Sequence, residues 1–495
     1  MTVLGAVPRK GICMNFVSPA ACGISESDLQ VFMGVLKRER VNLHSVLLAK
    51  GNDIFFEKYW APFTSGKPHR MYSETKSFVS VAIGCLIDEG KLSLESHIVE
   101  FFKDKLPEYV PEELKEQTIE DMLTMRTCFM GSNWFKPDVT DRLKFYFAQP
   151  VEKLPGTIFS YDSNGSYVMG CLVERLSGMS LIDYLKQKVL NTIGGFENAE
   201  ILKVCDGTPW GDSALVCESR ALMNFARFVL NMGAWQGRQL VSRDYMKAAT
   251  SFQTDNNPED VVTYCGYGYG RQFWLGSDGS FYLYGMGGQF GVCVPDKDLI
   301  MVTTADTQLN PAFGKSAIHR AFFDYIVKRP QPMADLDEEL TLSTASGRAS
   351  NPFAQKINGA RFVCKPNKMG ITELGFAFNG DTGEFNYVNA QGNKVLKFGM
   401  GKNEFGKFPQ LGYSNDFGNA RTSDGFMYDC AVSAAWVSQR EIRLKVQVID
   451  RYLGQLVINA DFKNENELSI QMVKRAEDFF DEYEGVLYAK RKIDT

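Results

Sequence analysis

Ser73 and Lys76, three positions apart in the segment MYSETKSF, are the residues whose types and spacing point most directly to chemistry. Positions i and i+3 lie on one face of a helix, so a hydroxyl and an amine can meet there without a histidine. Serine is a poor nucleophile until a base takes its proton. The spacing therefore predicts a serine activated by a lysine of the same helical turn. The pattern is common, and its plainer interpretation makes Ser73 a helix N-cap.

Two later segments offer partners for this pair. Tyr161, in PGTIFSYDSNGSYVMG, lies in a predicted loop before a helix, and a tyrosine beside a buried lysine can share proton transfer. Gly287 and Gly288 follow Met286 in YGMGGQFG, where glycines allow a strand to approach a ligand closely. Backbone N–H groups on such a strand can stabilise an oxyanion. The alternative for Tyr161 is an aromatic side chain packed in the core, and the alternative for the glycine segment is a strand that turns tightly.

Residues 1–335 have the α+β pattern of a domain that can position these groups. An amphipathic helix is predicted over 24–41, followed by the strands SVLLAKG and IFFEKYW. Helical segments predominate over 92–260, and strands return in SFYLYGMGG and DLIMVTTAD before a helix near 313–328. Strands at both ends with helices between them predict one sheet with a helical insertion.

The sequence changes character over 329–352, where Pro, Ser, Thr and acidic residues follow no periodicity. We therefore predict a linker over 336–352. In residues 353–495, short strands alternate with Asn-Gly, Gly-Asp and Asp-Gly turns, as in FNGDTGEFNYV. This pattern predicts a C-terminal all-β domain, either a sandwich or a barrel.

Composition excludes several classes of function. A net charge of −5 argues against a nucleic-acid surface, which needs clustered Lys and Arg. The 11 cysteines form no C-x-x-C pair, which favours free thiols and a cytoplasmic location over a disulfide framework. No apolar run reaches the ~18 residues of a membrane span. The four histidines are too scattered for a metal site, so neither metal nor cofactor is expected.

Other constellations are less convincing. A Ser-His-Asp enzyme would need one of the histidines near a G-x-S-x-G turn, which is absent. His69 precedes Ser73 by four residues and is interpreted as structural. Four aromatic residues are candidates for the wall of a cleft, with core packing as the favoured alternative: Trp134, Tyr267, Tyr269 and Trp274.

Taken together, the segments and their order resemble the serine β-lactamase and penicillin-binding-protein superfamily. Its motifs are Ser-x-x-Lys, Tyr-x-Asn or Tyr-x-Ser, and a Lys-Thr-Gly or His-x-Gly strand. The framework segments HSVLLAKGNDIFFEKYW, IDEGKLSLESHIVEFF and TIEDMLTMRT also look like this family, and the likeness covers residues 25–330. The nearest branch is class C β-lactamase-like, with esterases, D,D-peptidases and 6-aminohexanoate-dimer hydrolases. This resemblance implies an antiparallel sheet flanked by helices, plus a helical subdomain.

The resemblance also implies a role for each matching residue. Ser73 would be the acylated nucleophile, Lys76 its base, and Tyr161 the relay to the leaving group. The oxyanion hole would be formed by the backbone N–H groups of Ser73 and Gln289. Ser163 falls where many relatives have the Asn of the second motif.

Two departures from the family pattern bear on substrate. The second motif reads Tyr-Asp-Ser, with Asn164 one place too late. Met286 stands where β-lactamases have Lys or His, and methionine cannot bind a substrate carboxylate as that cation does. The substrate-binding candidates are Ser163, Met286, Gly287, Gly288 and Gln289.

We therefore expect a serine hydrolase that cleaves a small-molecule ester or amide. One alternative is a non-catalytic ligand-binding or sensor protein that retains the fold. The other is a β-lactamase or D,D-peptidase with an atypical third motif. The sequence does not fix the oligomeric state, and a homodimer is one option.

Overall fold

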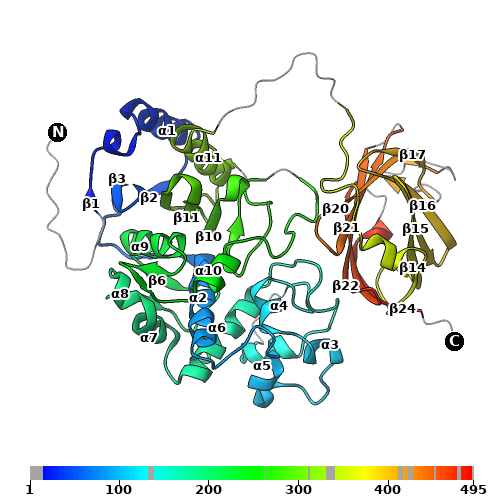
Figure 1. Ribbon diagram of the computed structural model, residues 1–495, viewed down its shortest axis with the longest axis horizontal. Coiled ribbons are helices and arrows are strands. Elements are labelled where there is room, and N and C mark those ends of the chain that lie inside the picture. Colours follow the sequence, from blue (N-terminus) through cyan, green and yellow to red (C-terminus); the bar gives the residue numbers. More distant parts are fainter. Residues whose placement is uncertain are drawn as a thin grey trace.

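The computed structural model describes residues 15–131, 139–261, 263–309, 313–329, 341–410, 416–417, 420–421, 427–450, 453–476 and 481–492. Within these ranges the chain builds two large sheets, one at each end of the molecule (Figure 1). Helices surround the first sheet, and the second sheet contains most of the C-terminal residues. The mixed α+β architecture predicted from the sequence is confirmed.

The first sheet is antiparallel except for the parallel pair β1–β3. It joins strands from both ends of the first 305 residues, as the sequence pattern predicted. Its seven strands lie in the order β1 (Asn15–Phe16), β3 (Asp53–Tyr59), β2 (Leu43–Lys50), β12 (Leu299–Ala305), β11 (Gln289–Val294), β10 (Phe281–Gly285) and β9 (Trp274–Leu275).

Side chains alternate between the two faces of this sheet, and each face packs on helices. On β2, Val46 and Leu48 join the core under α1 (Glu26–Arg38) and α11 (Phe313–Ala321). Leu47 and Ala49 join the opposite core, which contains α2 (Thr75–Asp88) and α9 (Ser219–Leu230). The sheet therefore lies between two helical layers (Figure 1).

A helical subdomain packs along α2, and it supplies the second motif. Its helices are α3 (Glu112–Lys115), α4 (Ile119–Leu123), α5 (Arg142–Phe147), α6 (Ser163–Ser177), α7 (Leu181–Leu185), α8 (Asn191–Ile193) and α10 (Arg243–Ala249). A small sheet of β4 (His69–Arg70), β6 (Leu215–Cys217) and β5 (Glu200–Ile201) joins it to the segment before Ser73.

The second large sheet closes into a barrel, because β16 pairs with β20 at the far end of the strand order. The sequence pattern allowed either a sandwich or a barrel, and the structure shows a barrel. Nine strands close it: β13 (Arg361–Cys364), β14 (Glu373–Asn379), β15 (Thr382–Asn389), β16 (Gly392–Met400), β20 (Asp429–Trp436), β21 (Glu441–Val448), β22 (Gly454–Asn464), β23 (Glu467–Ala476) and β24 (Gly485–Arg491). β17 (Glu404–Lys407) adds to β20.

Buried aromatic and aliphatic side chains fill the barrel interior, with Phe362, Phe376 and Trp436 among the most buried. Residues 336–340 of the predicted linker lie outside the described residues. The remainder, 341–352, contains no helix or strand in the described chain, and its Arg348 bridges to Trp436 on the barrel. The domain boundaries themselves stay a prediction.

Candidate active site

Ser73 lies in a 3-10 turn, Tyr72–Glu74, which runs directly into α2. The turn and the helix place Lys76 one turn further along the same face, and its Nζ is 3.0 Å from Ser73 Oγ. Lys76 is 1% exposed, so this amine is removed from water. Tyr72 has a φ of 48°, a strained left-handed conformation for an aromatic residue. The structure thus brings the predicted nucleophile and base into contact.

A buried ionic group holds Lys76 from the other side. Lys76 Nζ also donates to the main-chain carbonyl of Asp212 at 2.7 Å. The Asp212 carboxylate pairs with Arg142 at 2.7 Å, and Arg142 Nε donates to Asn164 Oδ1 at 2.6 Å. Both members of this ion pair are almost fully buried. Sequence reasoning missed Arg142 and Asp212, although Asn164 stood out as the displaced amide of the second motif.

Tyr161 lies beside this pair in the loop that leads to α6. Its ring centre is 5.0 Å from Lys76 Nζ. The helix that follows is capped by Asp162, whose side chain accepts from Asn164 N at 2.9 Å, and burial raises the pKa of Asp162. Ser163 is the first residue of α6 and is partly buried. Within the described part of the chain, the contacts of Lys76 run to Ser73, Asp212 and the Tyr161 ring and not to Ser163.

An aromatic cluster backs Tyr161. Trp274 packs on Tyr161 with ring centres 5.4 Å apart, and Tyr269 packs edge-on against Trp274 at 5.1 Å. Tyr269 is 1% exposed, so it acts as a core residue, whereas Tyr267 is about half exposed. Of the predicted wall, Trp274 is thus the residue that contacts the site. Trp134 lies outside the described residues.

The third motif forms the turn between β10 and β11. Gly287 and Gly288 have φ values of 88° and 94°, so the turn uses the left-handed region that glycine adopts at little cost. A Cβ on Gly285 would lie 2.2 Å from the carbonyl oxygen of Met71, two residues before Ser73. The end of β10 therefore packs directly on the segment that carries the nucleophile.

The side chain of Gln289 holds the turn between β10 and β11, a role that the sequence did not reveal. Its buried amide donates to the carbonyls of Met286 at 2.9 Å and Ala305 at 2.7 Å. Its Oε1 accepts from Ala305 N at 3.1 Å. These three hydrogen bonds fix the turn whose backbone N–H was predicted to face the oxyanion. Met286 itself is 50% exposed.

His69 makes a structural pair with His44, in line with the interpretation from the sequence. His69 Nδ1 lies 2.9 Å from the Arg70 carbonyl, so it must donate there, and its Nε2 accepts from His44 Nδ1 at 2.8 Å. Burial lowers the pKa of both imidazoles, which favours this neutral pair. Among the described residues, no three His, Cys, Asp or Glu side chains gather as metal ligands would.

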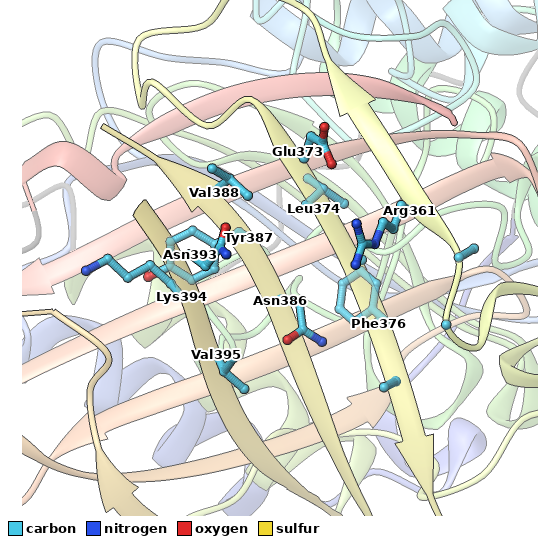
Figure 2. Close-up of a pocket in the computed structure, with 14 residues that line it drawn as sticks. Arg361, Glu373, Leu374, Phe376, Asn386, Tyr387, Val388, Asn393, Lys394 and Val395 are labelled. Atoms are coloured by element: carbon cyan, nitrogen blue, oxygen red, sulfur yellow. The ribbon is translucent and has the colours of Figure 1, made fainter. Parts of the chain in front are cut away.

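A separate hollow of about 430 Å³ lies on the barrel, across β13 to β16 (Figure 2). Polar side chains such as Arg361, Glu373 and Asn386 line it together with apolar ones such as Phe376 and Val388. None of the predicted site residues lines this hollow. In the ranges that the structure describes, no helix has the length and apolar character needed to cross a membrane.

Comparison with known proteins identifies the family and the fold. A family model described as Beta-lactamase matches residues 37–323. A curated relative, the 6-aminohexanoate-dimer hydrolase of Paenarthrobacter ureafaciens, is 21% identical over 250 residues, which cover 46% of this chain and 63% of that protein. The match thus spans less than two thirds of the relative.

Two solved structures share the fold over nearly the whole chain. The octameric penicillin-binding protein homologue from Pyrococcus abyssi has a TM-score of 0.50 at 16% identity and covers 93% of this chain and 99% of its own. SurE has a TM-score of 0.52 at 15% identity, and the match covers 96% of this chain and 100% of SurE. Because the family model matches more than half of the chain and the fold agrees, the protein belongs to the β-lactamase family.

Proposed function

We propose that this protein is a serine hydrolase that cleaves a small ester or amide through an acyl-enzyme on Ser73. The observation that carries the proposal is the 3.0 Å contact between the Nζ of buried Lys76 and Ser73 Oγ. The name of the curated relative, a hydrolase, supports the same class of reaction. We propose a cytoplasmic location and a small-molecule substrate as part of this function.

The proposed mechanism begins with neutral Lys76, which takes the proton of Ser73 as Oγ attacks the substrate carbonyl. The oxyanion accepts hydrogen bonds from the backbone N–H groups of Ser73 and Gln289. Tyr161 gives its phenolic proton to the leaving group and takes the proton that Lys76 received from Ser73, so the leaving group departs, Ser73 is acylated and Lys76 is again a base. Water activated by Lys76 and Tyr161 then hydrolyses the acyl-enzyme and restores the free serine.

Substrate preference follows from the third motif. Met286 is exposed at the turn, where a cation would be needed to bind a substrate carboxylate. A thioether cannot pair with an anion, so we propose uncharged esters or amides rather than β-lactams or peptides that end in D-alanine. Trp274, which packs on Tyr161, supplies an apolar surface for the acyl or leaving group.

The proposal is tested with a fluorophosphonate probe and short p-nitrophenyl esters. Wild type is expected to be labelled and to turn over the esters, and Ser73→Ala to lose both. Ser80→Ala is the control, because Ser80 is a serine on α2, the helix that follows Ser73, and its buried hydroxyl lies 3.1 Å from Tyr245 Oη rather than near Lys76. A wild type without labelling or turnover that depends on Ser73 would refute the hydrolase and favour a binding protein.

A further inference from the structure

The outer face of the barrel contacts the loop that carries Tyr161. Asp461 on β22 and Ser469 on β23 are direct cross-strand partners. Asp461 Oδ2 accepts the Ile158 N–H at 2.8 Å, and Ser469 Oγ accepts the Leu154 N–H at 3.0 Å. Both barrel side chains are nine-tenths or more buried, although they point away from the barrel core. Water therefore competes poorly for these hydrogen bonds.

Ile158 needs such support because of its backbone. Its φ of 39° lies in the left-handed region, where a β-branched residue is strained by about 1–3 kcal/mol. Strained residues persist only where their surroundings hold them. Asp461 supports Ile158 by accepting a hydrogen bond from its N–H. The hydroxyl of the neighbouring Thr157 lies 2.7 Å from Ser469 Oγ. Tyr161 follows three residues later in the same loop.

The barrel also holds the segment behind the aromatic cluster. Arg443, buried on β21, pairs with Asp255, and Asn459 Nδ2 on β22 donates to the Pro258 carbonyl at 2.9 Å. Next to Asp255, Thr254 is joined to Tyr269 by paired backbone hydrogen bonds. Tyr269 in turn packs on Trp274, which packs on Tyr161. Two separate segments thus connect the barrel to the same catalytic side chain.

We infer that the C-terminal barrel positions Tyr161, with Asp461 and Ser469 as the positioning residues. This inference rests on the proposed function, because it assigns Tyr161 a part in proton transfer. A loop released from these side chains would relax at Ile158 and displace the Tyr161 ring from Lys76. The barrel would then act on the rate of the chemical step and little on substrate affinity.

The chain offers a matched control for Ser469. Ser433 is equally buried on the barrel strand β20, and its Oγ accepts the Ala345 N–H at 2.9 Å. Each serine therefore accepts one backbone N–H from a segment outside the barrel strands, but only Ser469 contacts the Tyr161 loop. Loss of barrel stability alone should affect Ser469→Ala and Ser433→Ala alike.

The test compares the full-length protein with Ser469→Ala, Ser433→Ala, Tyr161→Phe and the double variant Tyr161→Phe/Ser469→Ala. With a p-nitrophenyl ester, Ser469→Ala should lower kcat about tenfold with KM within about twofold, a rate effect typical of misplaced catalytic groups. Ser433→Ala should stay within about twofold of wild type. In the Tyr161→Phe background, the Ser469→Ala effect should shrink to less than about twofold, since coupled residues are not additive.

Hydrogen exchange of the amides in residues 154–161 gives a readout that is independent of activity. Ser469→Ala should speed this exchange, and Ser433→Ala should not. Unchanged exchange in Ser469→Ala would overturn the inference, as would an equal loss of kcat in the wild-type and Tyr161→Phe backgrounds. If Ser469→Ala speeds exchange but the wild type never reacts at Ser73, the proposed function is refuted while the contact between the barrel and the loop stands.

Discussion

The buried ion pair between Arg142 and Asp212 provides the sharpest test of how the site is held. We expect Asp212→Ala to leave the Arg142 guanidinium buried without its carboxylate. The two side chains are only 2% and 4% exposed, and breaking such a pair costs about 3–5 kcal/mol of unfolding free energy. The main-chain carbonyl of residue 212 accepts from Lys76, so the same change should also move the base.

Its matched control is Asp104→Ala, which breaks the Arg175–Asp104 pair. That pair makes two hydrogen bonds, but its side chains are 36% and 55% exposed. An exposed pair contributes about 0–1 kcal/mol, so the control should be several-fold less destabilising than Asp212→Ala. Urea denaturation followed by circular dichroism measures both. Equal costs for the two variants would contradict the assignment of a buried pair.

Activity and stability should separate in a double variant. Arg142→Met/Asp212→Ala removes both charges, and replacing a buried pair by apolar groups is often close to neutral for stability. The double variant should therefore be less destabilised than Asp212→Ala alone. Ester turnover should remain about 10- to 100-fold below wild type, because residue 212 has lost the ion pair that holds its main-chain carbonyl in place beside Lys76. Recovery of turnover together with stability would refute the link between the ion pair and the base.

Three further outcomes are expected. Burial raises the pKa of Glu74 well above 4.5, so the folded state keeps a proton that the unfolded state releases. The stability contribution of Glu74 therefore falls by about 1 kcal/mol per pH unit as the pH rises from 4.5 to the folded pKa. Glu74→Gln should remove this slope in thermal unfolding measured from about pH 5 upward, and parallel curves for the two proteins would contradict the reasoning. Gly285→Ala should destabilise the protein by about 1–3 kcal/mol and reduce probe labelling, because the new Cβ would collide with the Met71 carbonyl. Gly406→Ala is the control and should do neither, since a Cβ at Gly406 has no atom within 4 Å. Met286→Lys should increase acylation by nitrocefin, which has a carboxylate, and efficient nitrocefin hydrolysis by wild type would show that the cation is not needed.

Local features of the site could be predicted from the sequence, because they depend on few residues. The contact between Ser73 and Lys76 follows from helical spacing, and Gly287 and Gly288 do adopt the conformations that favour glycine. The pairing of Arg142 with Asp212 could not be predicted, since 70 residues separate them and neither belongs to a local pattern. Asn164 was recognised as displaced from its motif, but nothing local indicated that it faces Arg142.

The fold shows the same division. Short strands separated by Asn-Gly, Gly-Asp and Asp-Gly turns predicted an all-β domain in residues 353–495, yet a sandwich and a barrel share that pattern. Closure depends on the pairing of β16 with β20, which is settled by three-dimensional register rather than by composition. The contacts of Asp461 and Ser469 with the Tyr161 loop were beyond reach for the same reason, since they join residues about 300 positions apart.

That separation has a consequence for synthesis of the chain. Ile158 and Asp461 are 303 residues apart, which corresponds to about 15–60 s of translation at about 5–20 residues per second. The strand that completes the barrel, β24, pairs with β13 and β23 and is made later still. A nascent chain therefore contains Ser73, Lys76 and Tyr161 long before the strands that fix the Tyr161 loop exist. The catalytic residues are therefore synthesised early, and the contacts that support the Tyr161 loop form only after the barrel strands are made. Until then the loop of a ribosome-bound chain lacks these contacts.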